Sequence, residues 1–584
     1  NPRKKRCTRS IKPVRERNFC NPRNDAPERF RICNATKTLR RSTSTPTIPP
    51  HGTNPRKAIP LIHITGTKGK GSTACLCEAI LRKRGYRTGL FTSPHLMTIR
   101  ERIRINGRPI DEELFGEVYW TLRQCFEEAE EDDDGDGPPI LPGYFRMLTL
   151  MALHTFHQVE VDVMILEVGM GGRYDATNFI NHHTNDSNIT TVCGVTLLDL
   201  DHCRVLGTTL EEIAWEKGGI FAVDKTSGVS SVSPKPIPIN TTTDEGEACP
   251  IRQTGLTQPR IEPSTNTNEH KHAKFFVLDS NTSSVINVLK RCAQHNIEGI
   301  GEVVLVDANG TDLRAVMNNK GSALGLAGEH QYGNANLALH LCQAISNGIT
   351  ANLNNTSKII STSEDVTTLE AISEASWPGR CQTIPQPTTG TFYLDGAHTV
   401  QSLTATLQWF AHATSKRIPT SNPKVLVFTC GHERNPVELL SLILQYTTLA
   451  TTNNFFRVYF ATADSTRPSP VSMPTLEELL HPKPVRPELV VGTSNRNRVA
   501  TWPETLGSVW NHLTANAQTE TSFESVHCNV NGTATQVLHD LHTKTVLEQT
   551  QPQQQPYDVL VTGSLYLVGS FLTALEWSEE SYHP

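Results

Sequence analysis

The stretch that most constrains this chain is residues 59–73, IPLIHITGTKGKGST. An apolar run leads into a loop that holds Gly66, Gly69 and Gly71, and helix-forming sequence follows the loop. A strand, a glycine-rich turn and a helix start bind phosphate well, because backbone N–H groups converge on the anion at the positive end of the helix. Glycines let the backbone approach the ligand without clashes from Cβ atoms. The stretch therefore predicts a nucleotide site within an α/β fold.

Two side chains in this loop indicate how a phosphate would be held. Lys70 is placed to reach the β- and γ-phosphates, and the hydroxyl of Ser72 lies at the predicted start of the helix. The loop is shorter than the common G-x-x-x-x-G-K-[ST] pattern. The alternative is a glycine-rich turn that carries two surface lysines, and the strand before and the helix after make it the weaker interpretation.

Charge is distributed unevenly along the 584 residues. Residues 1–57 hold 16 Lys and Arg against 3 Asp and Glu, so we expect a basic, disordered arm. An Arg-rich, acid-poor arm suits a mitochondrial presequence, although a clear amphipathic repeat is missing from it. The rest of the chain is acidic, which argues against nucleic acid as a partner.

The apolar runs and the cysteines indicate in which cellular compartment the chain is expected. No apolar run approaches the roughly 18–20 residues that cross a bilayer, so we expect at most peripheral membrane contact. The 14 cysteines include no CxxC pair, which is typical of reduced thiols inside a cell. We expect a monomer in the cytoplasm, the mitochondrion or both.

Strand and helix patterns alternate after the phosphate loop. Residues 144–158 have helical spacing, a buried-type strand ends at Glu167, and another strand pattern covers 190–202. Such alternation predicts a doubly wound, mostly parallel sheet whose functional groups lie at the carboxyl ends of the strands. Glu167 and His202 are each expected at such an end.

The pattern divides the chain into two large parts. We expect an ATP-binding domain over 58–368, with a disordered insertion at 223–273, and a hinge at 369–376. A second, Rossmann-like α/β domain is expected over 377–584, because four apolar runs in this part each end at a turn. These runs are FYLDGAHT (392–399), KVLVFTCGHE (424–433), FRVYFATA (456–463) and DVLVTGSLYLVG (558–569).

Ten motifs in one order resemble the folylpolyglutamate synthases of the Mur ligase superfamily, which are ATP-dependent amide-forming enzymes. The motifs are GTKGKGS (66–72), TSPHL (92–96), ERIRING (101–107), EVGMGGRYDATN (167–178), DH (201–202), AWEKGGIF (214–221), GEHQYGNA (328–335), PGR (378–380), DGAHT (395–399) and VTGSLYLVG (561–569). The short phosphate loop is the form that this superfamily uses. The resemblance implies a P-loop ATPase domain of Mur-ligase type followed by a Rossmann-like domain.

The implied activity adds L-glutamate to the γ-carboxyl of tetrahydrofolate and of folylpolyglutamates through an acyl phosphate, giving ADP and phosphate. Relatives that join dihydropteroate to glutamate more often show Asn-Pro after the His of DGAHT, where this chain has Thr399 and Val400. A dihydrofolate synthase and a nucleotide-binding homologue that does not ligate remain the alternatives.

The resemblance also implies a Mg²⁺ site at Ser93, Glu167 and His202, with K⁺ or another monovalent cation as a further cofactor. Glu167 is also a candidate on physical grounds, because a carboxylate that ends an apolar strand needs a partner when it is buried. Lys217 matches a lysine that is carbamylated in bacterial relatives, which requires a lowered pKa of the amine.

The remaining carried-over roles concern ATP and the folate. The residues implied to bind ATP are Gly69, Lys70, Gly71, Ser72, His330, Asn334, Arg380 and Asp395. The residues implied to act in catalysis are Lys70, Lys217 and His398. Arg100, Arg102 and Arg104 alternate in the sequence, so we expect them on one face of a strand, where they would attract a glutamate tail or simply face solvent.

Overall fold

The computed structural model describes most of the chain after residue 58. The described ranges are 59–131, 141–179, 191–221, 274–295, 301–353, 365–415, 422–432, 434–449, 455–463, 479, 501–516, 527–548 and 556–578. The basic arm at 1–57 and the insertion at 223–273 lie outside the described residues. Those two predictions therefore stay predictions.

The first part of the chain forms an eight-stranded sheet with strand order β4-β3-β2-β5-β1-β6-β7-β8. Its strands are β1 (Leu61–Thr65), β2 (Thr88–Phe91), β3 (Ile103–Ile105), β4 (Arg108–Pro109), β5 (Val163–Glu167), β6 (Thr191–Val195), β7 (Lys274–Leu278) and β8 (Glu302–Val306). The pairs β2–β3 and β3–β4 are antiparallel, and all others are parallel. β1 lies between β5 and β6, so the loop after β1 meets the ends of both neighbours.

Helices cover both faces of this sheet, because the buried strands point apolar side chains to each side in turn. One face packs against α2 (Lys70–Lys83), α9 (Thr311–Asn319), α10 (Gln331–Leu353) and α11 (Val366–Glu374). The other face packs against α3 (Glu112–Glu131), α4 (Tyr144–Gln158), α7 (Leu210–Lys217), α8 (Ser283–His295) and η4 (Gly218–Phe221). Shorter helices are η2 (Ile99–Arg102), η3 (Ala176–Phe179) and α6 (Cys203–Leu206).

The second part forms a six-stranded sheet with strand order β13-β12-β11-β14-β10-β9. Its strands are β9 (Gln382–Gln386), β10 (Gly390–Leu394), β11 (Lys424–Phe428), β12 (Phe455–Thr462), β13 (His527–Thr533) and β14 (Tyr557–Thr562). Only β9 pairs antiparallel in the described part of this sheet. One face packs against α12 (Val400–Ser415), α13 (Pro436–Leu449) and α15 (Trp502–Asn516), and the other against α16 (Ala534–Glu548) and α17 (Leu565–Ala574).

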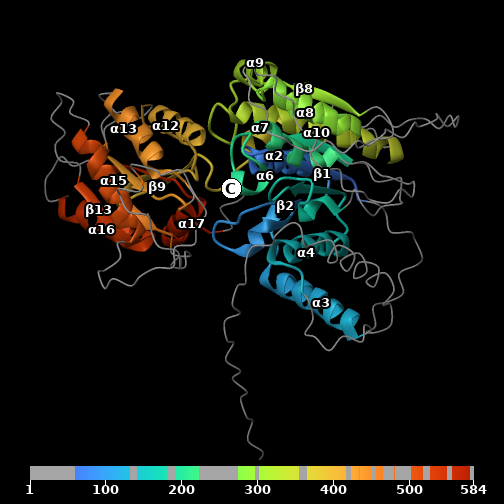
Figure 1. The fold of residues 1–584 in the computed structure, drawn as a ribbon, viewed down its shortest axis with the longest axis horizontal. Coiled ribbons are helices and arrows are strands. Elements are labelled where there is room, and N and C mark those ends of the chain that lie inside the picture. Colours follow the sequence, from blue (N-terminus) through green and yellow to red (C-terminus); the bar gives the residue numbers. More distant parts are fainter. Residues whose placement is uncertain are drawn as a thin grey trace, which may run out of the picture.

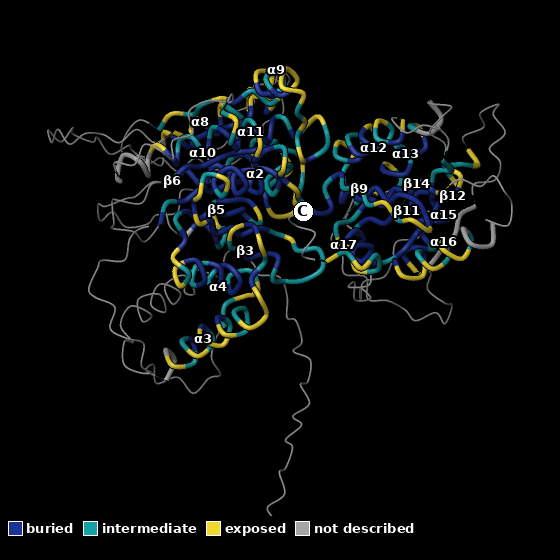
Figure 2. The backbone as a smooth tube through the Cα atoms, turned by 180° about the vertical axis from the view of Figure 1, so that it is seen from behind, coloured by how far each residue is buried: buried dark blue, intermediate teal, exposed yellow. Residues whose placement is uncertain are grey.

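The two units stand side by side, with the second unit in orange and red in Figure 1. Buried strands form the centre of each unit, whereas exposed residues concentrate on the outer helices (Figure 2). The units also share apolar contacts, because Leu96 and Met97, from the loop after β2, pack against the core around α17. A loop of the first unit is therefore anchored in the second unit.

The predicted fold class is confirmed: two α/β units with mostly parallel sheets follow one another along the chain. The hinge predicted at 369–376 stays a prediction. Most of it belongs to α11, where Leu369 and Ile372 are buried against α2, so the chain leaves the first unit after Glu374. Within the described residues, no helix combines the length and the apolar character needed to span a membrane.

Candidate active site between the two units

The phosphate loop joins β1 to α2, and its glycines adopt conformations that other residues avoid. Gly69 has φ of 88° and caps α2, which begins at Lys70. A Cβ atom at Gly69 would overlap the side-chain oxygen of Asn334, and one at Gly66 would overlap the hydroxyl of Thr196. Both positions therefore require glycine for the left-handed backbone and for the close neighbours.

Neighbouring elements fix the loop from two directions. The backbone N–H groups of Thr67 and Lys68 donate to Leu197 O at 2.9 and 3.0 Å. The Lys217 ammonium donates to Gly66 O at 2.7 Å. Lys217 is 4% exposed, and burial together with the charge of Lys70 lowers its pKa to about 7. The loop is therefore held by a buried lysine that loses its proton near neutral pH.

The start of α10 packs against the start of α2. Gln331 donates from Nε2 to the Ser72 hydroxyl at 3.4 Å, and Asn334 donates from Nδ2 to Gln331 Oε1 at 2.8 Å. Asn334 also lies next to Gly69. The predicted residues Ser72 and Asn334 are thus brought together at the loop, and Gln331, which the sequence analysis did not single out, links them.

Glu167 ends β5 as predicted and lies beside Ser93. Its Oε2 accepts the backbone N–H of Ser93 at 2.9 Å, and the carboxylate is 4% exposed. Burial raises the pKa of Glu167, while the nearby cations Lys70 and Arg380 favour its charged form. Oε1 accepts no hydrogen bond from a described residue. A buried carboxylate with one uncommitted oxygen fits a hard cation such as Mg²⁺.

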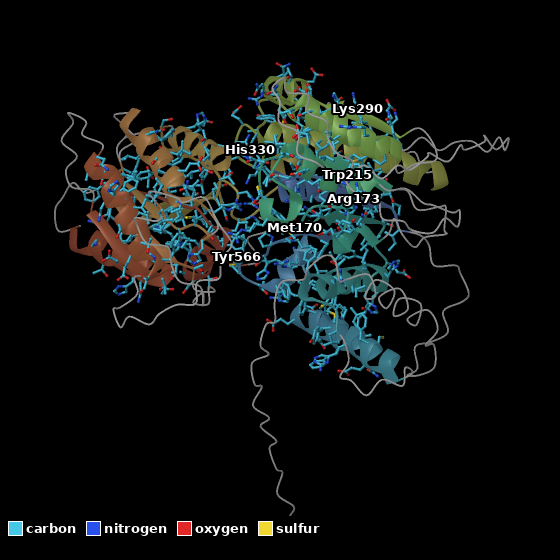
Figure 3. All side chains as sticks on the ribbon, viewed as in Figure 1. Met170, Arg173, Trp215, Lys290, His330 and Tyr566 are labelled. Carbon is cyan, nitrogen blue, oxygen red and sulfur yellow. The ribbon has the colours of Figure 1, made fainter. Side chains whose placement is uncertain are left out.

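Glu167 lines a cleft with about 400 Å³ of empty space, part of it open to solvent. Gly71 and Ser93 contribute from the first unit, and Trp377 and Arg380 contribute from the segment that leads into the second unit. In Figure 3, His330, Met170 and Tyr566 lie along the same boundary between the units. The cleft therefore lies between the two units, at the carboxyl ends of β2 and β5 and beside the start of α17.

His202 is placed differently from the prediction. β6 ends at Val195, so His202 is not at the strand end but caps the short helix α6, in the left-handed conformation with φ of 52°. It does not line the cleft of Glu167. Burial, with the charges of Lys70, Lys217 and Arg434, lowers the pKa of His202. Of the three predicted metal ligands, only Ser93 and Glu167 are in contact.

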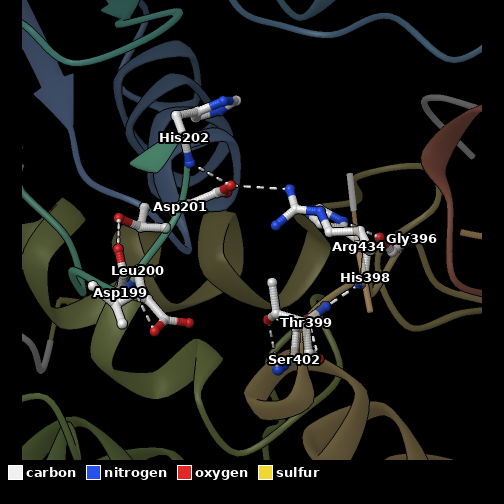
Figure 4. A network of polar contacts seen from close by, with 10 residues as sticks. Asp199, Leu200, Asp201, His202, Gly396, His398, Thr399, Ser402 and Arg434 are labelled. Carbon is white, nitrogen blue, oxygen red and sulfur yellow. Dashed lines mark hydrogen bonds and ion pairs between the residues drawn. The ribbon is translucent and has the colours of Figure 1, made fainter. Parts of the chain in front are cut away.

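The second unit reaches this region through Arg434, as Figure 4 shows. Arg434 Nη2 lies 3.0 Å from Asp201 Oδ1, and the same oxygen accepts the backbone N–H of His202 at 2.9 Å. Lys68 is close to both charged groups, and burial lowers its pKa to about 8 despite the attraction of Asp201 and Asp199. An ion pair between the units thus stands beside the phosphate loop.

His398 and Asp395 come from the motif DGAHT. His398 Nδ1 lies 2.8 Å from Gly396 O, so Nδ1 carries the proton and Nε2 is left as an acceptor. Burial and the positive charge of Lys68 lower the pKa of His398 to about 4. Asp395 is engaged within the protein, because its two oxygens accept from the Cys381 N–H and Sγ, the Ala397 N–H and the Thr406 hydroxyl. A contact between Asp395 and a ribose stays a prediction.

The prediction for the three arginines is wrong in its geometry. Arg100 and Arg102 belong to η2, and only Arg104 lies on a strand. The reason is Glu101, whose carboxylate accepts the backbone N–H groups of Leu96, Met97 and Thr98 at 2.7–2.9 Å and winds this segment into a helical turn. Only Arg104 of the three lines the cleft.

The sequence analysis gave no role to three residues of this region. Asp201 belongs to the motif DH (201–202) and Trp377 directly precedes PGR, so their position in the sequence was an available signal. Arg434 occupies GHERNP (431–436), but no local pattern reveals an ion pair with a residue more than 200 positions away. No cluster of three or more His, Cys, Asp or Glu that could hold a metal ion occurs in the described part of the chain.

Comparisons with known proteins agree on one family, although no family model matches the chain. Human mitochondrial folylpolyglutamate synthase is 36% identical over 401 residues, which cover 66% of this chain and 56% of the relative. The folylpolyglutamate synthase of Saccharomyces cerevisiae (strain FostersO) is 30% identical over 533 residues, which cover 88% and 77%. This chain thus spans little more than half the length of the human relative that it matches.

Solved structures agree in fold. A Mycobacterium tuberculosis folylpolyglutamate synthase complexed with ADP has a TM-score of 0.59 at 20% identity and covers 94% of this chain and 95% of its own. At this identity the likeness supports the two-unit architecture alone.

Proposed function

This chain belongs to the folylpolyglutamate synthase family, and we propose that it is an ATP-dependent ligase that adds L-glutamate to the γ-carboxyl of tetrahydrofolate and folylpolyglutamates. The observation that carries the proposal is the cleft at the first turn of α2. There a buried carboxylate, Glu167, meets two cations from different segments, Lys70 and Arg380. Such a site suits the transfer of a phosphoryl group to a carboxylate.

ATP would bind with its β- and γ-phosphates on the loop. The backbone at Gly69 and Gly71, the Lys70 ammonium and the Ser72 hydroxyl would hold the phosphates, and Arg380 would approach from the second unit. No ion pair or side-chain hydrogen bond to another described residue occupies Lys70 or Arg380. We propose that Asn334, His330 and Asp395 lie around the nucleotide.

In the first chemical step, an oxygen of the folate γ-carboxylate attacks the γ-phosphorus, and the bond to the β–γ bridging oxygen of ATP breaks. The products are an acyl phosphate and ADP. Charge on the transferring oxygens grows between Lys70 and Arg380, whose fixed positive charges stabilise it without reorganisation of water.

Ser93 and Glu167 would hold Mg²⁺, with His202, which does not line the cleft, as a third candidate. When bound, the ion neutralises phosphate charge and orients the transferring group. Mg²⁺ takes few protein ligands and fills its shell with phosphate oxygens and waters, which is compatible with the small donor set here. A monovalent cation such as K⁺ stays part of this proposal.

In the second step, the neutral amine of glutamate attacks the acyl carbon, the bond from that carbon to the phosphate oxygen breaks, and the departing phosphate accepts the proton that the amine loses. A pKa of about 4 makes His398 a weak base, so its Nε2 would accept a hydrogen bond from the amine and orient it rather than remove its proton. Lys217 supports the loop through its hydrogen bond to Gly66 O. Its lowered pKa is also the condition for carbamylation, which we keep as a proposal.

The cellular setting is proposed on the same basis. The human relative is named mitochondrial, and the basic character of residues 1–57 suits import into that organelle. Import of the full chain into isolated mitochondria, compared with the chain lacking residues 1–57, tests this proposal. Equal import of both would show that the arm is not a targeting signal.

The activity test supplies ATP, Mg²⁺, tetrahydrofolate and labelled glutamate and compares wild type with Lys70→Ala and Glu167→Gln. We expect labelled folylpolyglutamate and ADP from wild type, and a loss of roughly 100-fold or more in kcat for each variant. The matched controls are Lys83→Ala, on the exposed end of the same helix, and Glu302→Gln, on an exposed strand edge. Equal incorporation by all variants would refute the site.

Product analysis separates the alternatives. Extension of a folate that already carries a glutamate identifies the proposed ligase, whereas glutamate added only to dihydropteroate identifies a dihydrofolate synthase. ATP binding without ADP production, with both substrates present, would leave a nucleotide-binding homologue.

A further inference from the structure

Trp377 is the aromatic residue of the cleft, and its indole nitrogen lies beside the phosphate loop. The point where a Cβ atom of Gly71 would stand is 3.4 Å from Trp377 Nε1 and 3.5 Å from Glu167 Oε2. Gly71 belongs to the first turn of α2. The indole N–H and the Glu167 carboxylate therefore border the same small space above the helix start.

The indole N–H is an uncommitted donor. Among the residues that the structure describes, none accepts a hydrogen bond from Trp377 Nε1. A polar hydrogen that borders a cleft without a protein acceptor is available to a ligand oxygen. Arg380 lines the same cleft and is likewise uncommitted, and the uncommitted Lys70 lies near enough to Glu167 to favour its charged form.

The face of the Trp377 ring is in contact with a cation. The Arg104 guanidinium lies 4.7 Å from the centre of the Trp377 ring. Arg104 is itself 3% exposed and donates to Glu101 O at 3.0 Å and Gly107 O at 3.2 Å. A cation held by the backbone of the first unit thus positions the ring. In this arrangement the indole nitrogen lies on the side of α2.

The turn after Trp377 places Arg380 next to the ring. Trp377 O accepts the backbone N–H of Arg380 at 3.3 Å, and both side chains line the cleft. Residues 377–380 therefore present a neutral donor and a cation together as the chain enters the second unit.

From this geometry, and resting on the proposed function, we propose that Trp377 donates its indole N–H to an oxygen of the phosphoryl group as it passes from ATP to the substrate carboxylate. No bond to Trp377 forms or breaks, and the proton stays on the indole. The neutral indole N–H stabilises the phosphoryl oxygen through a directed hydrogen bond. Because it carries no positive charge, it does not compete with a metal ion for the Glu167 carboxylate. Removing one such preorganised donor lowers kcat by roughly 100-fold in other enzymes.

The first test is Trp377→Phe, which exchanges the indole for a smaller phenyl ring, so that Arg104 keeps an aromatic partner while the N–H group is lost. We expect kcat to fall by roughly 10- to 100-fold, while the KM for ATP changes by less than about threefold, because the donor acts on the transferring group. The matched control is Trp120→Phe, which removes the N–H of an exposed tryptophan that stacks on Arg123 at 5.3 Å. Wild-type kcat in Trp377→Phe would overturn the proposal.

A second readout does not depend on turnover. Indole ¹⁵N–¹H NMR of the full chain shows the tryptophan side chains, and the signal lost in Trp377→Phe identifies the residue. We expect this signal in wild type to shift with ADP plus aluminium fluoride, which mimics the transferring phosphoryl group, and to shift much less with ADP alone. An unmoved signal with both ligands would overturn the proposal.

The experiments also separate a structural role and a failure of the proposed function. If the N–H instead supports Glu167, then Trp377→Phe should regain full kcat at saturating Mg²⁺, which would refute donation to the phosphoryl group. If wild type incorporates no glutamate while the indole signal still responds to ADP and aluminium fluoride, the ligase proposal fails and the phosphoryl contact stands.

Discussion

Replacing Lys217 by methionine probes the buried lysine that supports the phosphate loop. Methionine keeps the length and apolar stem of the side chain but removes the ammonium that donates to Gly66 O. Burial is the largest cause that lowers the pKa of Lys217, from 10.5 to about 7, and Lys70 adds to it. In the unfolded chain the amine is solvated and returns to its ordinary pKa.

The pH dependence follows from this difference. Between about pH 7 and 10.5 the unfolded chain binds a proton at Lys217 that the folded chain does not bind, so stability rises with pH across this window. The slope approaches about 1.4 kcal/mol per pH unit, and the whole window is worth about 5 kcal/mol. As the pH falls from about 10.5 to about 7, this stability is lost. Below about pH 7, Lys217 is protonated in both the folded and the unfolded chain. Lys217→Met lacks the group and should lack the slope.

Urea denaturation of wild type and Lys217→Met at about pH 7.5, 8.5 and 9.5 measures the difference directly. We expect the free energy of unfolding of wild type, relative to the variant, to increase at each step. Lys83→Met is the matched control on α2. Lys83 is exposed and pairs with Glu374, which raises its pKa, so it stays protonated in both states over this range.

A difference that does not change with pH would refute a lowered pKa of the Lys217 amine. Carbamylation gives a distinct result, because a carbamate is an anion and does not titrate as an amine. A flat difference in bicarbonate that becomes pH-dependent after CO₂ is removed would therefore identify the modification. A flat difference under both conditions would refute both interpretations.

Three further predictions concern the loop, the boundary and the histidine. Gly69→Ala should lose about 1–2 kcal/mol of unfolding free energy to left-handed strain and weaken ATP binding, as calorimetry can check; unchanged binding would contradict the loop geometry. A double-mutant cycle of Asp201→Asn and Arg434→Gln, followed by thermal unfolding, should give a coupling of about 1–2 kcal/mol, and zero coupling would show that the ion pair is dispensable. The His398 imidazole should show no titration between about pH 5 and 8 by ¹⁵N NMR, and a midpoint near its ordinary pKa would contradict its burial.

Local patterns predicted the elements well wherever a segment's own sequence decides its structure. Residues 144–158 show helical spacing of apolar side chains, and α4 spans Tyr144–Gln158. The phosphate loop was predicted from its glycines, and their positive φ angles and close neighbours explain why the pattern is so specific. Burial of the Glu167 carboxylate also followed from an apolar strand that ends in an acidic residue.

The predictions failed where a hydrogen bond to another part of the chain decides the local conformation or occupies a side chain. Alternation of Arg100, Arg102 and Arg104 suggested a strand, but the Glu101 carboxylate captures three backbone N–H groups and changes the local backbone. The sequence of DGAHT gave no sign that Asp395 is occupied by Cys381, Ala397 and Thr406. Such hydrogen bonds depend on tertiary packing, which a linear motif does not encode.

The site depends on three links between the units, and each has a different chemistry. Leu96 and Met97 bury apolar surface in the core of the second unit, and the hydrophobic effect stabilises this contact. The Arg434–Asp201 pair is electrostatic, and its oxygen also holds the backbone of His202. Trp377 stacks on Arg104 with its nitrogen toward α2. Trp377 also packs against the core of the first unit, so separation of the units would move Arg380 rather than the indole away from Lys70. The position of the second unit is therefore part of the catalytic geometry that we propose.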